Sequence, residues 1–164
     1  MAQSPAFPDI QSQRSAMSAL SFLVGTWFGE ARIFRESGDP LELIQTEDVQ
    51  YKLGGLVLII EGIGRNKADG KLVLQALAII SYDDEAHRYR MRAYNDGRYL
   101  ETDLELVQEH KGVSWGFVGG GTKTSSVLRI DENGKWTEST QITSGSQPSR
   151  NLIELAVSLQ GNSA

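Results

Sequence analysis

The chain has 164 residues, of which 40% are hydrophobic and 23% are charged, and this composition fits one globular domain. The absence of cysteine excludes disulfides, thiolate zinc sites, iron–sulfur clusters and cysteine nucleophiles. A formal net charge of -5 and a pI of about 5.1 argue against a nucleic-acid partner.

Neither a membrane span nor a secretion signal is predicted. The apolar run from Leu56 to Ile60 is far shorter than the ~20 residues that a bilayer-crossing helix needs. Residues 1–16 have a single basic side chain, Arg14, and lack the apolar stretch of a signal peptide. We therefore expect a cytoplasmic protein.

The N-terminal part of the chain divides into an arm and a helix. Residues 1–14 contain two of the four prolines and have no hydrophobic period, which predicts a flexible arm before a domain over residues 15–164. Apolar side chains at helical spacing between Ser15 and Gly25 predict a short amphipathic helix. Ser15 is the expected N-cap, and Gly25 stands where the helix should end.

After Gly25 the hydrophobic period becomes two, which predicts β-strands. The ten expected strands cover residues 26–35, 41–52, 56–65, 71–82, 87–94, 98–107, 113–118, 125–130, 135–143 and 150–159. Turn sequences such as Asp69-Gly70 and Asn133-Gly134 separate them and favour tight hairpins. Consecutive strands should therefore pair antiparallel, as an up-and-down meander.

The predicted fold class is all-β. Ten antiparallel strands either split into a sandwich or close into a barrel, and closure removes the unpaired strand edges. We expect a closed up-and-down barrel, with the N-terminal helix plugging one end. Loops rich in Gly, Ser, Asp and Pro follow alternate strands and should frame a mouth at the other end.

A short motif supports this architecture. Gly25, Trp27 and Gly29 stand at the junction of the predicted helix and first strand, and this spacing resembles the Gly-x-Trp signature of calycin barrels. The surrounding segment, residues 20–30, is most similar to bacterial lipocalin-like and nitrobindin-like proteins. The resemblance implies a calycin barrel in which the large, rigid Trp27 side chain has a structural role at the closed end.

The histidines separate this chain from the haem-binding pattern of nitrobindin-like proteins, which have a histidine ligand late in the chain. The sequence has only His87, at the plugged end, and His110, in a predicted turn. Two isolated histidines also make a metal site improbable. We therefore expect neither haem, nor another cofactor, nor a metal ion.

The period of two assigns side chains to the inner face of the barrel. The residues predicted to contact a ligand are Trp27, Tyr51, Glu61, Tyr89, Met91, Asn95, Trp115, Trp136 and Glu138. Among acidic side chains, Glu47, Glu61 and Glu138 are expected to point inward, where burial would raise a carboxyl pKa towards neutrality.

Two further patterns concern strand faces. Arg88, Arg90 and Arg92 alternate along one strand, either as a solvated ladder that pairs with acidic residues of the next strand or as a cationic lining for a carboxylate ligand. The acidic residues are Glu101, Asp103 and Glu105. An apolar outer stripe predicts a homodimer interface and consists of Val57, Ile59, Val73, Leu77 and Ile79.

The leading functional prediction is a non-catalytic barrel that binds or transports a small, mainly hydrophobic molecule, with or without a carboxylate end. No P-loop, dinucleotide fingerprint, nucleophile elbow or paired-histidine motif is present. One alternative is a calycin-shaped isomerase or cyclase in which Glu138 or Glu61 moves a proton. The other is a structural or interaction protein without a small ligand.

Overall fold

The computed structural model describes residues 7–107 and 111–161. Its helical elements are α1 (Ile10–Ser18) and two short 3-10 turns, η1 (Ser21–Leu23) and η2 (Leu53–Gly55). The strands are β1 (Gly25–Ile33), β2 (Leu41–Lys52), β3 (Val57–Asn66), β4 (Leu72–Asp83), β5 (Arg88–Asn95), β6 (Arg98–Leu106), β7 (Gly112–Gly119), β8 (Thr122–Ile130), β9 (Lys135–Ser144) and β10 (Arg150–Leu159).

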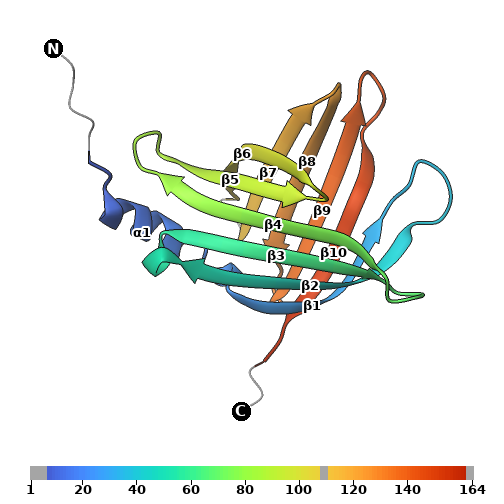
Figure 1. Ribbon diagram of the computed structural model, residues 1–164, viewed down its shortest axis with the longest axis horizontal. Coiled ribbons are helices and arrows are strands. Elements are labelled where there is room, and N and C mark those ends of the chain that lie inside the picture. Colours follow the sequence, from blue (N-terminus) through green and yellow to red (C-terminus); the bar gives the residue numbers. More distant parts are fainter. Residues whose placement is uncertain (1–6, 108–110, 162–164) are drawn as a thin grey trace.

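The strands form a closed antiparallel barrel, which confirms the predicted fold (Figure 1). Each strand pairs with its neighbours in sequence, and β1 closes the ring by pairing with both β2 and β10. The strand bounds agree with the sequence-based ones to within three residues. The largest shift is at β8, because Gly120 and Gly121 both adopt positive φ and make a tight turn that lets Thr122 pair with Gly119.

The helix begins five residues before its predicted start at Ser15. Asp9 is the N-cap, and its side chain accepts a hydrogen bond from the backbone N–H of Ser12 (2.9 Å). Asp84, in the β4–β5 turn, holds the same segment by accepting bonds from the Asp9 N–H and the Gln13 side chain, both at 2.7 Å. Residues 10–14, predicted as part of an arm, are therefore helical; residues 1–6 lie outside the described part.

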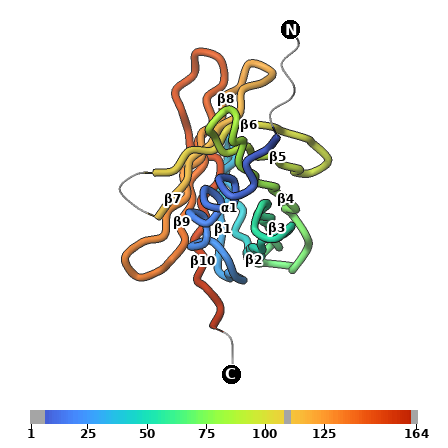
Figure 2. Tube along the Cα trace, turned by 90° about the vertical axis from the view of Figure 1, so that its left-hand side faces the viewer, coloured from blue at the N-terminus to red at the C-terminus, as the bar shows by residue number. Residues whose placement is uncertain are grey.

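The helix plugs one end of the barrel, as predicted. Figure 2 looks at that end and shows α1 lying across the ring of strands. Two tyrosines anchor the helix: the Tyr51 hydroxyl donates to the Met17 carbonyl oxygen (2.6 Å) and the Tyr89 hydroxyl to that of Ala16 (2.7 Å). Met17 is fully buried beneath them.

The apolar core fills the space next to the plug. Trp27 is 2% exposed, and its indole N–H donates to the Leu23 carbonyl oxygen (2.8 Å). Its ring meets Trp136 edge to face, with centroids 5.4 Å apart. The predicted structural role of Trp27 at the closed end is thus confirmed.

The shortest strand pairing in the barrel is that between β6 and β7. Among the described residues, three pairs join these strands, all near the plugged end, from Leu104 with Trp115 to Leu106 with Val113. Farther along, the Thr102 hydroxyl donates to the Gly116 carbonyl oxygen (2.7 Å). Beyond that bond the β5–β6 and β7–β8 hairpins diverge towards the open end (Figure 1).

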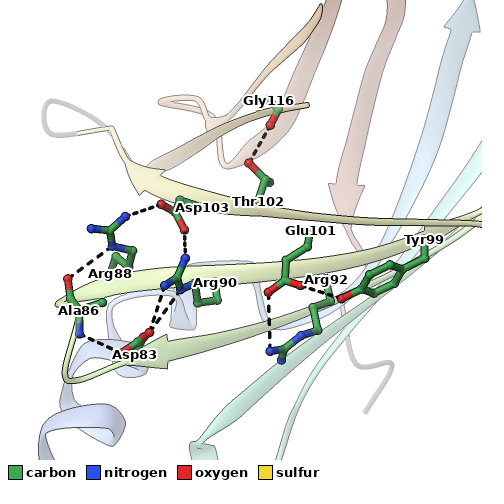
Figure 3. A network of polar contacts seen from close by, with 10 residues as sticks. All are labelled: Asp83, Ala86, Arg88, Arg90, Arg92, Tyr99, Glu101, Thr102, Asp103 and Gly116. Carbon is green, nitrogen blue, oxygen red and sulfur yellow. Dashed lines mark hydrogen bonds and ion pairs between the residues drawn. The ribbon is translucent and has the colours of Figure 1, made fainter. Parts of the chain in front are cut away.

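The three arginines of β5 lie on the outside of the barrel and pair with acidic neighbours (Figure 3). Asp103 accepts bonds from Arg88 (2.9 Å) and Arg90 (2.8 Å), and Arg92 lies 3.8 Å from Glu101. The solvated ladder is therefore the correct alternative, and the cationic lining is wrong. Glu105, the third predicted partner, is not among the ion pairs of the described residues.

Candidate functional site

A cavity of about 640 Å³ lies inside the barrel and opens at the end opposite α1. Its lining comes from every strand of the barrel, so the whole closed sheet encloses it. At this size the cavity falls within the range of about 300–1,000 Å³ that is typical of small-molecule sites.

Small side chains on one wall create the space. Ala78 pairs with Ala93 across β4 and β5, and Ala76 pairs with Asn95 at the next inward position. Larger apolar side chains complete this wall and include Ile60, Leu74, Ile80, Met91, Leu100, Trp115 and Phe117. Because three adjacent alanines carry only a methyl group, the barrel interior stays hollow at this level.

The opposite wall is polar. Gln45 (2% exposed) and Glu47 (7% exposed) project inward from β2, and the Gln45 amide N–H donates to Glu47 Oε1 at 2.7 Å. On β8 and β9, the hydroxyls of Ser126 and Thr140 share a hydrogen bond of 2.7 Å. Glu138, between them and the plug, accepts a bond from the Trp136 indole N–H at 3.3 Å.

Two glycines of β3 make room for the polar side chains of β2. A methyl group on Gly62 would lie 2.8 Å from Glu47 Oε2, and one on Gly64 would lie 2.7 Å from Gln45 Oε1. These distances are shorter than van der Waals contact. Gly62 and Gly64 therefore leave the space in which the Glu47 carboxyl and the Gln45 amide lie against β3.

Burial changes the acidity of both interior carboxyls. Desolvation, strengthened by the neighbouring Glu138, raises the pKa of Glu47 from 4.5 to about 8. Desolvation also raises the pKa of Glu138, to about 7, against the opposing effect of the Trp136 hydrogen bond. Glu47 therefore keeps its proton at neutral pH, and Glu138 titrates there.

The mouth of the cavity carries the one basic side chain of the described lining, Arg98. Arg98 is exposed at the start of β6, opposite Asn95 on β5. The Asn95 Oδ1 atom is buried and has no hydrogen-bond partner. Arg98 was not among the residues predicted from the sequence, although it shares the strand parity of the inward residues Leu100 and Leu104.

The predicted ligand-contact residues divide into three groups. Met91, Asn95, Trp115, Trp136 and Glu138 line the cavity, together with the predicted inward carboxyl of Glu47.

Trp27, Tyr51 and Tyr89 also face inward, but they lie at the plugged end, where they pack against or bind the helical segment. The structure places these three side chains in the plug and not in the cavity lining.

The prediction that Glu61 points into the barrel is wrong. Glu61 is exposed on the outer face of β3, because its neighbours Ile60 and Gly62 take the inward positions. It therefore cannot serve as an acid or base inside the barrel.

His87 does not line the cavity. His87 is in the β4–β5 turn with a positive φ, and His110 lies outside the described residues. Within the described part of the chain, no three His, Cys, Asp or Glu side chains gather to hold a metal ion.

A larger hollow of about 1130 Å³ lies on the outside of the plugged end, next to η1 and the start of β7. Exposed charged side chains, including Arg88 and Glu105, form much of its edge. The enclosed interior, with its convergent polar groups, is therefore the better candidate site.

Among the helices that the structure describes, none has the length and apolar character that crossing a membrane requires.

Comparison with known proteins supports the fold. No family model matches the chain, and neither does any curated protein. The crystal structure of Rv2717c from M. tuberculosis is similar, with a TM-score of 0.70 and 16% identity over 89% of this chain and 98% of that one. The S-type phycobiliprotein lyase CpeS from Guillardia theta has a TM-score of 0.63 and 9% identity, over 98% and 100% of the two chains. At these identities the likeness shows a shared barrel fold and no more.

Proposed function

We propose that the barrel binds a small, mainly hydrophobic molecule in its interior and performs no chemistry on it. The observation that supports this is the cavity of about 640 Å³, open at one end and walled by apolar side chains on β3 to β7. A protein that needed only a stable barrel would gain packing energy by filling this space, since voids destabilise a core. The alternative of a purely structural protein therefore fits less well.

The proposed binding mode follows from the distribution of polar groups. The apolar body of the ligand lies between the alanines of β4 and β5 and the rings of Trp115 and Phe117. A carboxylate on the ligand, where there is one, lies at the mouth, next to the guanidinium of Arg98. This arrangement is that of a lipocalin-like carrier, the group that the Gly25-x-Trp27 motif resembles.

Binding can be tested with n-decanol as a neutral probe, followed by tryptophan fluorescence because Trp115 and Trp136 line the cavity. The substitution Ala93→Phe places a ring in the cavity and should weaken binding about tenfold or more. Ala156→Phe makes the same change on the outer face of β10, opposite Glu30, and should leave binding unchanged. Equal affinities for the two variants would contradict an interior site.

A second candidate is an isomerase or cyclase of this shape. The observation that favours it is a pair of interior carboxyls, Glu47 and Glu138, whose pKa values lie near neutrality. A structural neighbour, CpeS, is described as a lyase, so this barrel shape is compatible with an enzyme. Turnover of a bound substrate that is lost in Glu138→Gln, with binding retained, would establish catalysis.

A further inference from the structure

The inner wall of the cavity holds more hydrogen-bond acceptors than donors. Glu47 and Glu138 present two carboxyl groups, and the Oε1 atom of Gln45 is buried without a partner. Gln45 is only 2% exposed, so bulk water does not reach that oxygen. A buried acceptor without a donor is costly, and such an atom in a cavity wall indicates a missing donor.

The N–H groups next to these carboxyls already donate to them. The Gln45 amide donates to Glu47, and the Trp136 indole donates to Glu138. The titratable side chains of the described lining are Glu47, Glu138 and Arg98, and Arg98 lies at the mouth. The inner wall therefore has no positive charge of its own.

We propose that the ligand carries a protonated amine at its inner end, which Glu47 and Glu138 receive together. This inference rests on the proposed binding function and names the chemical class of the ligand: a hydrophobic molecule with one basic nitrogen. An ammonium group supplies three N–H donors and one positive charge, which suits two carboxylates and a neighbouring amide oxygen. The aliphatic or aromatic body would then extend along the alanine wall towards the mouth.

Proton release should accompany binding. An ammonium group between the two carboxyls stabilises their ionised forms and so lowers both pKa values. In the empty barrel these values are raised, to about 8 for Glu47 and about 7 for Glu138, so the carboxyls must lose protons when the cation arrives. Affinity for an amine should therefore rise between about pH 6 and pH 9, below the ordinary pKa of an alkyl ammonium group near 10.

The opposite orientation makes the opposite prediction. If the carboxyls stayed protonated and donated to a ligand carboxylate, affinity for that ligand would fall as the pH rises through the same range. The sign of the pH dependence thus distinguishes the two ligand classes.

Calorimetric titration of the full-length protein with n-decylamine, n-decanol and decanoate compares three head groups on one alkyl chain. The amine is expected to bind about tenfold more tightly than the alcohol, to release protons, and to gain affinity as the pH rises. Glu47→Gln and Glu138→Gln should each remove about tenfold of the amine affinity and leave that of the alcohol unchanged. Glu61→Gln, on the outer face of the adjacent strand, is the matched control and should have no effect.

Equal affinity for amine and alcohol, or tightest binding of decanoate with an inverse pH dependence, would overturn the amine assignment and leave the proposed binding function intact. Failure of all three probes to bind would instead contradict that function as well.

Discussion

Glu47→Gln should make the ligand-free protein more stable at alkaline pH. Glu47 is buried against Gly62 and Gln45 and faces Glu138, the one charged group that contributes to its pKa. Its pKa is raised from 4.5 to about 8, so the folded protein holds a proton that the unfolded chain has already released. Stability should therefore fall as the pH rises from about 4.5 to about 8 and level off above that pH.

The magnitude follows from the size of the pKa change. Each pH unit between the two pKa values corresponds to about 1.4 kcal/mol, so ionising Glu47 in the folded state costs on the order of 5 kcal/mol. Part of this cost is repulsion from Glu138, and the neutral Gln side chain removes that repulsion together with the buried charge. We expect Glu47→Gln to recover about 2–4 kcal/mol of the free energy of unfolding at pH 9, and almost none at pH 5.

Urea denaturation of the two proteins between about pH 5 and pH 9 measures this difference directly. The range avoids the surface carboxyls of Asp83, Asp84 and Asp103, whose pKa values are lowered and which lose stabilising charge only in more acidic solution. Glu61→Gln, an exposed control, should follow the natural protein. Parallel pH profiles for Glu47→Gln and the natural protein would refute the reasoning.

Three further predictions concern packing and assembly. Gly62→Ala should destabilise the protein by about 1–3 kcal/mol in thermal or urea unfolding, because the new methyl group meets the Glu47 carboxyl, and the loss should shrink in a Glu47→Ala background. Tyr89→Phe removes the hydroxyl that donates to the Ala16 carbonyl oxygen and should lower the free energy of unfolding by about 1 kcal/mol. Because this bond holds only the helix, faster amide hydrogen exchange should be confined to α1. The outer apolar stripe, including Ile79, predicts a dimer, so light scattering at micromolar concentration should give twice the chain mass; a monomer mass would remove this proposal.

The strand pattern was predictable because two independent signals agree along most of the chain. The glycine-containing turns mark where strands end, and the period of two marks their faces. The helix start was missed although its signal is present: Asp9 follows Pro8 and stands three residues before Ser12, the spacing of an N-cap bond. The absence of an apolar period in residues 10–14 outweighed that signal.

The inner face was less predictable where a strand is apolar on both sides. On β3 the inward positions include Gly62 and Gly64, which have no side chain to reveal their direction, so Glu61 was placed inside in error. Strand parity shows which face of the sheet a side chain lies on, but not how far along the barrel axis it lies. Tyr51 and Tyr89 face inward as predicted, yet they lie at the level of the plug because they stand near strand ends.

A crystal structure of the protein grown with n-decylamine tests the central claim most directly. We predict electron density for the alkyl chain along the alanine wall at Ala78 and Ala93, with the nitrogen within hydrogen-bond distance of Glu47 and Glu138. An interior filled by protein side chains, or a ligand bound only on the outer surface, would contradict the claim that this barrel is a container.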